Sequence, residues 1–232
     1  AAGRSVGAPV APAPAGVVAL DFGAPGGPVF PGFAPADADS PAVSGRRVTA
    51  VTRPGVDALA RDGLAGVEAI RVPLAPGRWT VKLWLEDLGA WEYVPHALRR
   101  RVRVQGRPVI DRTDTPESWV AGRWLRGAAG GAAAADAWEA FGARRGGTVP
   151  ITVEVDEAGL LVELAGDAPG AIFVAGLIAV PEGREDAIAE VVRAQALRFA
   201  AAWPVDRTAE AASGEAGAAG DPVRLVLAPG ER

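Results

Sequence analysis

Cysteine and methionine are both absent from this sequence, and histidine occurs only once. Without cysteine, the chain has neither a disulfide framework nor a thiolate nucleophile. A zinc site of histidine and cysteine ligands is also excluded, because one imidazole cannot supply the usual set of nitrogen and sulfur atoms. The missing methionine predicts that the chain has been processed, since translation begins with this residue.

The first residues, AAGRSVGAPVAPAPAG, are small, apolar and rich in proline. Such a stretch is typical of what remains after an export signal is cleaved beyond an A-x-A-like site. We therefore expect an exported protein, periplasmic or extracellular; the alternative is a chain trimmed at both ends. The uncharged residues 5–20 are too short and too interrupted by proline to cross a bilayer as a helix.

Lysine is scarce, and acidic residues slightly outnumber basic ones. The formal net charge is −4, the pI is about 5.2, and Lys82 is the single lysine. Binding to nucleic acid depends on a basic face that displaces counterions from the phosphates. The composition therefore argues against a nucleic-acid partner.

The pattern of apolar residues indicates a globular β protein. Hydrophobic residues make up 49% of the 232 residues, enough to bury a sizeable core. Short alternating or apolar runs between Gly/Pro turns predict strands at 17–22, 47–52, 66–72, 78–85, 98–104, 109–112, 148–155, 160–165 and 171–180. Many short strands with almost no helix favour a β-sandwich.

One strand pair follows from a turn. The PLAPG turn at 73–77 predicts that 66–72 and 78–85 form a hairpin. Within 78–85 the period of two separates two faces: Trp79, Val81, Leu83 and Leu85 against Thr80, Lys82, Trp84 and Glu86. In the strand at 98–104, we expect Val102 and Val104 to face inward. An arginine-rich face, solvated or against an acidic partner, is expected from Arg99, Arg100, Arg101 and Arg103.

Residues 183–203 break the strand pattern. Apolar residues recur there at helical spacing, and Pro204 ends the helix that they predict. The expected organisation is an extended Pro/Ala arm at 1–16, a sandwich at 17–182 with an irregular insertion at 116–147, this amphipathic helix, and an extended tail at 204–232.

Four stretches, in order, resemble malectin-like domains, which belong to the galactose-binding-like jelly-roll sandwiches. They are DFG at 21–23 with GPVFPGF at 27–33, VPLAPGRWTVKLWLED at 72–87, RVRVQGRPVIDRTDT at 101–115 and GLLVELAGDAPGAIFVAGLIAV at 159–180. The resemblance implies a mostly β chain, a jelly-roll β-sandwich to which this sequence adds one C-terminal helix and extended terminal arms. Gln105-Gly106 departs from the Asn-Gly usual in that family.

The loop EDLGAWEYVPH at 86–96 is the first candidate site. In the family that the chain resembles, ligand loops at one end of the sandwich stack aromatic rings on sugars and offer acids to the hydroxyl groups. The residues placed for this are Glu86, Asp87, Trp91, Glu92 and Tyr93. The alternative is that Trp91 packs under the 116–147 insertion and the acids are solvated.

The irregular insertion is the second candidate site. Aromatic residues concentrated in such a segment either form a small satellite core or present a partner interface, where Trp and Arg dominate the binding energy. The residues expected at this interface are Trp119, Arg123, Trp124, Arg126, Trp138 and Phe141.

Catalysis finds little support. His96 is the only base around which a nucleophilic triad could form, and the acids of 86–96 lie in one loop, whereas a glycosidase needs two carboxyl groups across a sugar. Acidic runs at 36–40 and 111–115 are read as ordinary turns, with carboxylate calcium sites as the alternative. No phosphate-binding glycine motif is present. We expect neither enzymatic activity nor a cofactor.

Together these observations predict a non-catalytic structural or accessory subunit of an exported or envelope-associated assembly, whose partners are other protein subunits. The sandwich would serve as the interaction scaffold. The alternative is an exported carbohydrate-binding module that recognises glycans through 86–96.

Overall fold

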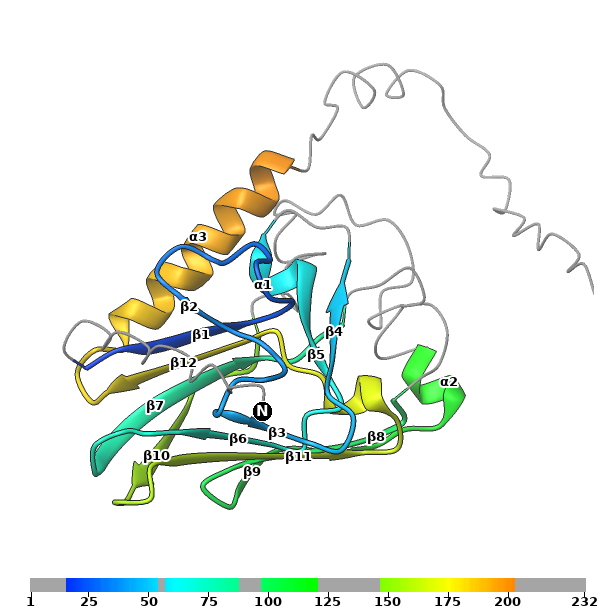
Figure 1. Ribbon diagram of the computed structural model, residues 1–232, viewed down its shortest axis with the longest axis horizontal. Helices are drawn as coiled ribbons and strands as arrows, with labels where there is room; N and C mark the ends of the chain where they lie inside the picture. Colours follow the sequence, from blue (N-terminus) through cyan, green and yellow to red (C-terminus); the bar gives the residue numbers. More distant parts are fainter. Residues whose placement is uncertain (1–15, 54–56, 88–96, 121–146, 203–232) are drawn as a thin grey trace, which may run out of the picture. The chain divides into compact units, whose positions relative to one another are not determined.

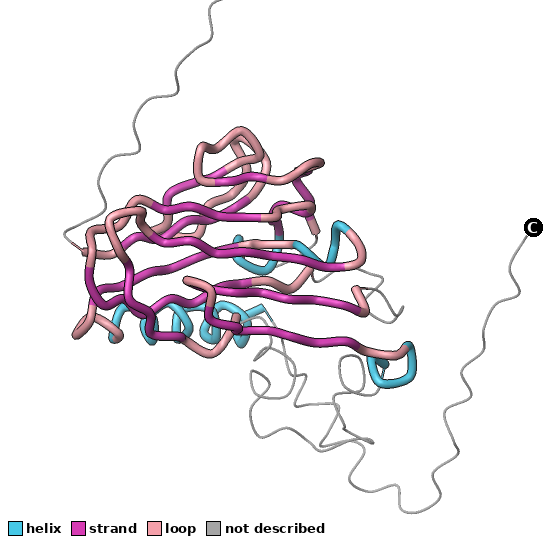
Figure 2. Tube along the Cα trace, turned by 90° about the horizontal axis from the view of Figure 1, so that it is seen from below, coloured by secondary structure: helices cyan, strands magenta, loops and turns pink. Residues whose placement is uncertain are grey.

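The computed structural model describes residues 16–53, 57–87, 97–120 and 147–202, and two five-stranded sheets form a β-sandwich there (Figure 1). The first sheet runs, in spatial order, β10 (Ile151–Val155), β7 (Gly77–Trp84), β12 (Gly176–Pro181), β1 (Val18–Phe22) and β2 (Ala34–Ala36). The second sheet runs β3 (Val43–Ser44), β6 (Ala69–Val72), β11 (Leu160–Gly166), β8 (Arg99–Val104) and β9 (Arg107–Thr113). Figure 2 shows their strands running in much the same direction, as in aligned sheet packing.

The smaller elements flank this sandwich. Strands β4 (Thr49–Thr52) and β5 (Asp62–Ala65) pair with each other. The helical segments are α1 (Ala58–Arg61), α2 (Pro116–Trp119), the 3-10 turn η4 (Pro169–Ile172) and α3 (Asp186–Ala202). The predicted β-sandwich with a C-terminal helix is confirmed. The arms predicted at 1–16 and 204–232 lie outside the described residues, residue 16 excepted. In the described part of the chain, no helix is both long and apolar enough to cross a membrane.

The consecutive strands β6 and β7 lie in different sheets. Strand β6 pairs with β3 and β11, whereas β7 pairs with β10 and β12. The hairpin predicted for 66–72 and 78–85 is therefore wrong. The PLAPG turn does reverse the chain, but it carries it across the sandwich, and each strand gains two neighbours in its own sheet.

The core between the sheets follows the predicted alternation. Trp79, Val81 and Leu83 of β7 belong to it, together with Leu177 and Ala179 of β12. On β8, the inward side chains include Val102 and Val104, both fully buried. Burial of side chains this size contributes roughly 1.5–3 kcal/mol each, so the sandwich rests mainly on this layer.

The other face of β7 is buried as well, beneath α3. Trp84 donates a hydrogen bond from Nε1 to Oε1 of Gln195 at 2.8 Å, and Nε2 of Gln195 donates to Oδ1 of Asp57 at 3.2 Å. Phe33 lies edge-on to Trp84, with 5.9 Å between the ring centroids. A second apolar cluster thus holds α3 and α1 against the first sheet.

Lys82 shares this covered face and is buried. Its Nζ donates to the carbonyl oxygen of Thr148 at 2.5 Å and lies 5.7 Å from the centroid of the Trp84 ring. Burial lowers the pKa of Lys82 to about 8, because removal from water penalises the charged ammonium group. The sequence predicted its side of the strand correctly, but not that a helix covers that side.

Replacing Lys82 by methionine is expected to raise the free energy of unfolding at pH 7 by about 1 kcal/mol, because a buried charge is removed. Between about pH 8 and 10.5 the folded wild type binds fewer protons than the unfolded chain, so its stability rises with pH there. The variant should lose this rise. Urea unfolding at pH 7 and 9.5 measures both effects, with Arg78→Met, an exposed cation of the same strand, as the control. A Lys82→Met variant that is less stable than the wild type at both pH 7 and pH 9.5 would contradict this prediction.

Strands β8 and β9 form a hairpin around Gln105 and Gly106. Both residues have positive φ, 49° and 72°, as a two-residue type I′ turn requires. The glutamine serves where Asn-Gly is usual because its side chain accepts a hydrogen bond from the Leu161 amide at 2.9 Å. It also donates to the carbonyl oxygen of Glu154 at 3.3 Å. The turn is thereby joined to β10 and β11.

One residue of the predicted arginine-rich face lies inside. Arg99, Arg101 and Arg103 are exposed, but Arg100 has the same strand parity as Val102 and is only 3% exposed. Its guanidinium donates to the carbonyl oxygens of Leu85 and Phe173. Placing Arg100 outward was wrong, because the run of arginines concealed the alternation.

Several short elements had no sequence signal strong enough to predict them. They are β2, β3, α1, β5 and α2. The last begins with a reciprocal pair, in which Thr115 and Ser118 each accept the other's backbone amide. One ordered turn therefore opens the segment that was expected to be irregular.

Candidate functional site

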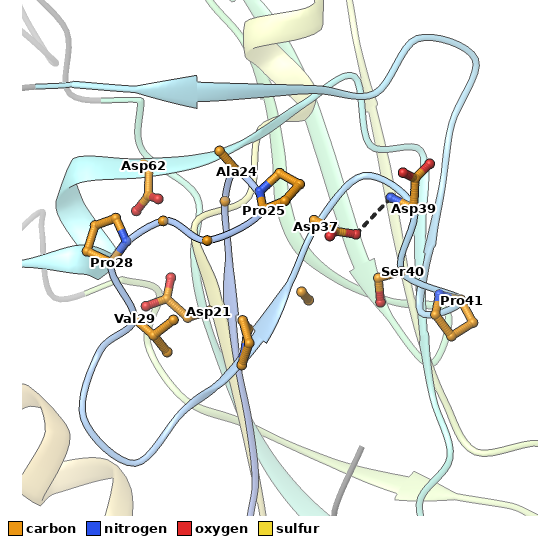
Figure 3. Close-up of a pocket in the computed structure, with 15 residues that line it drawn as sticks. Asp21, Ala24, Pro25, Pro28, Val29, Asp37, Asp39, Ser40, Pro41 and Asp62 are labelled. Atoms are coloured by element: carbon orange, nitrogen blue, oxygen red, sulfur yellow. Dashed lines mark hydrogen bonds between the residues drawn. The ribbon is translucent and has the colours of Figure 1, made fainter. Parts of the chain in front are cut away.

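An acidic pocket is lined by residues of β1, of β2 and of the loop between them, and by Asp62 (Figure 3). Leu20 and Phe22 of β1 point into the core, so Asp21 between them points outward. The loop after β1 covers Asp21, which is 3% exposed. The amide of Phe30, in this loop, donates to Oδ2 of Asp21 at 2.6 Å.

Asp62 approaches from a different element. It ends α1 and begins β5, and it is 2% exposed. A Cβ atom at Gly23 would stand 2.3 Å from Oδ2 of Asp62, so only glycine allows the loop to pass this carboxylate. Figure 3 shows Asp21 and Asp62 directed toward one another beside the loop that carries Pro25 and Pro28.

Both carboxyl groups are shifted toward the neutral form. Burial raises the pKa of Asp21 to about 7; the Phe30 amide opposes this shift, and the carboxylates of Asp62 and Asp57 add to it. Burial also raises the pKa of Asp62 to about 6, against the lowering effect of Arg61. The floor of the pocket gains negative charge between pH 6 and 7.

Replacing Asp21 by asparagine should stabilise the protein at pH 7.5 but change little at pH 4. The folded state binds the Asp21 proton up to about pH 7 and the unfolded state only to about 3.8, so wild-type stability falls as pH rises between these values. Asparagine resembles the neutral carboxyl and still accepts from Phe30. We expect the variant to be about 1–2 kcal/mol more stable at pH 7.5. Urea unfolding at pH 4, 5.5 and 7.5 checks this, with exposed Asp39→Asn as control; a pH-independent difference would contradict it.

The pocket has a volume of about 450 Å³ and opens between the loop after β1 and the turn after β2. Its walls include the rings of Pro25, Pro28 and Pro35, and its rim carries Asp37 and Asp39. Acceptors thus converge on the floor, beside rigid apolar surfaces. Such a site can bind cations or hydrogen-bond donors.

The described residues of the 86–96 loop are held by ion pairs. Arg53 grips Asp87 with two hydrogen bonds, at 2.8 and 3.0 Å. Glu86 lies 3.4 Å from Nη1 of Arg100. These acids fix the base of the loop, so part of their accepting capacity is already used. The other residues predicted there lie outside the described residues: Trp91, Glu92 and Tyr93.

Of the residues predicted for a partner interface, the structure describes Trp119, which is 3% exposed. A buried ring agrees with the satellite-core alternative for this residue. The other members of that prediction lie outside the described residues: Arg123, Trp124, Arg126, Trp138 and Phe141. So does His96, the base of the catalytic alternative.

The acidic runs form local hydrogen bonds and ion pairs. Oδ1 of Asp37 accepts the amide of Asp39 at 3.0 Å, Asp111 pairs with Arg101, and Asp114 pairs with Arg112. Across the described ranges, no group of three or more Asp, Glu or His residues is placed to hold a metal ion.

Sequence reasoning missed this pocket. Asp21 was noticed within DFG only as part of a family resemblance, and Asp62 was not singled out at all. A usable signal was present: an acid interrupts the apolar strand VVALDF and is followed by a Gly/Pro loop that can approach a ligand closely. Asp62, by contrast, lies 41 positions after Asp21 in the sequence, and only the fold brings the two residues together.

Comparison with known proteins found no matching family model and no matching curated protein. Among solved structures, the chain is similar to plant receptor-like kinase FER, with 13% identity over 71% of this chain and 42% of that chain, TM-score 0.40. It is also similar to a structure of plant peptide RALF23 in complex with FER and LLG2, with 15% identity over 73% of this chain and 41% of that chain, TM-score 0.41. A third similar structure is a Bacteroides uniformis beta-glucuronidase, with 9% identity over 71% of this chain and 18% of that chain, TM-score 0.41. The chain spans less than half the length of each of these proteins.

Proposed function

We propose that this chain is a non-catalytic accessory subunit that docks onto other proteins in an exported or envelope-associated assembly. Its malectin-like sandwich serves as the scaffold. The observation that carries the proposal is the acidic pocket, where Asp21 and Asp62 converge on a rigid sheet beside proline walls. A pre-formed concave site of this size is typical of a recognition surface.

The non-catalytic part of the proposal draws on the chemistry of the two carboxyl groups. Acid–base enzymes with two carboxyl groups usually push their pKa values apart, so that one is protonated while the other is ionised. Here burial raises the pKa values of both Asp21 and Asp62. A shift of both groups in the same direction does not divide them into an acid and a base, which favours binding over proton transfer.

The alternative function is glycan recognition through the 86–96 loop. The ion pairs Arg53–Asp87 and Arg100–Glu86 favour it in one respect, because they fix the loop at its base. A fixed base lowers the entropy lost when a loop binds. Trp91 and Tyr93 would then supply the stacking surface.

A site-specific photo-crosslinking experiment separates the two. Benzoylphenylalanine replaces Val29, at the pocket, or Glu157, in the exposed turn after β10. In native cells we expect one reproducible protein adduct from position 29 and none from position 157. The recombinant chain should bind no glycan on a glycan array. No adduct, together with glycan binding that Trp91→Ala abolishes, would replace the proposal by the carbohydrate module.

A further inference from the structure

The acidic pocket also carries information about its ligand. Asp62 is 2% exposed, yet its Oδ1 has no hydrogen-bond partner within the described part of the chain. A buried acceptor without a donor is costly, and more so when it carries charge. A ligand that brings both a donor and a positive charge would offset this cost.

The surroundings point to an organic cation. The charges of Asp62 and Asp57 both act on Asp21, and Asp37 and Asp39 add negative charge at the rim. Arg61 is the neighbouring cation whose charge acts on Asp62. Acids therefore predominate, and a cleft lined by charge of one sign concentrates ligands of the opposite sign.

The walls distinguish between kinds of cation. A calcium ion takes six to eight oxygen ligands, and the described residues contain no cluster of three or more metal-binding side chains. A guanidinium group needs fewer acceptors, because its planar fork bonds a single carboxylate through two parallel N–H groups. Its flat faces and the methylene stem pack well on apolar surfaces such as the rings of Pro25, Pro28 and Pro35.

We propose that the acidic pocket accepts the arginine side chain of a partner polypeptide, with the guanidinium on Asp62 and Asp21 and the stem along the prolines. This inference rests on the proposed docking function and specifies its chemistry. The glycine at position 23 is part of the site, because it lets the loop lie against the Asp62 carboxylate.

The test is an amide NMR titration of the full chain with the peptide acetyl-Gly-Arg-Gly-amide at pH 7.5. Shifts should concentrate at Gly23, Gly27 and Asp62. Asp62→Asn should raise the dissociation constant at least tenfold. Citrulline in place of the peptide's arginine should do the same, because citrulline keeps the shape of the side chain but removes its charge. Glu157→Gln, which removes a carboxylate from the exposed turn after β10, outside the pocket, should change the dissociation constant less than twofold.

A second arm keeps the test independent of how Asp62→Asn folds. Wild-type binding should weaken at least tenfold from pH 7.5 to pH 5, because protonation of Asp21 and Asp62 removes the negative floor while Arg61 keeps its charge. Equal binding of the citrulline peptide, or shifts elsewhere, would overturn the inference. Shifts at these amides with calcium chloride but not with the arginine peptide would also overturn it, in favour of a metal site.

Crosslinking separates failure of this inference from failure of the proposed function. If position 29 still captures its protein in the Asp62→Asn background, the docking function stands and the arginine inference falls. If position 29 captures nothing and the arginine peptide causes no shifts, both are rejected.

Discussion

Replacing Arg100 by alanine is expected to lower the free energy of unfolding by about 3 kcal/mol or more, the usual cost of breaking a buried charge pair from one side. The guanidinium donates to the carbonyl oxygens of Leu85 and Phe173 and pairs with Glu86. Leu85 and Glu86 follow β7 and Phe173 follows η4, so Arg100 joins β8 to two other segments of the chain. The loss of stability should therefore be cooperative and visible in a single urea transition.

The matched control for this prediction is Arg101→Ala on the same strand. Arg101 is exposed and pairs with exposed Asp111 at 3.4 Å, an interaction expected to contribute less than about 1 kcal/mol. Arg100→Lys adds a further comparison, because it keeps the charge but loses the planar fork, and an intermediate loss is expected. Equal effects of the alanine changes at 100 and 101 would show that Arg100 is not the anchor described here.

Replacing Trp84 by alanine should cost about 3–5 kcal/mol, the range for deleting a buried aromatic side chain. Trp84 is 2% exposed and packs between the first sheet and α3, where it bonds Gln195. Because α3 and α1 are joined through Gln195 and Asp57, we expect the loss to weaken the attachment of both. Hydrogen exchange of α3 amides should accelerate more than exchange in β8 or β11.

Trp84→Phe divides this effect into two parts. The ring is largely kept and the indole hydrogen bond is lost, for an expected cost of about 1–3 kcal/mol. Leu197→Ala, at an exposed position of the same helix, is the control and should change stability by less than about 0.5 kcal/mol. If Trp84→Ala left α3 exchange unchanged, the helix would be held by other contacts.

The 86–96 loop and the acidic pocket show how far sequence reasoning reached at the candidate sites. The sequence predicted Glu86 and Asp87 as ligand-binding acids of one loop, but their arginine partners are 14 and 34 residues away in the chain. No local spacing reports such pairs. Asp21 and Asp62 likewise lie close together because β1 contacts β5, and no turn or side-chain period in the sequence indicates that contact.

The sequence by itself determined the elements whose signal is local. Alternation placed Trp79, Val81 and Leu83 on the core face, short runs between turns placed the strands that pair as β8 and β9, and helical spacing placed α3. The tertiary structure alone decided which sheet each strand joins, that α3 buries the second face of β7, and that Arg100 lies inside. The physical reason is that side-chain period fixes only which way a residue faces. What it faces depends on contacts between segments far apart in the chain.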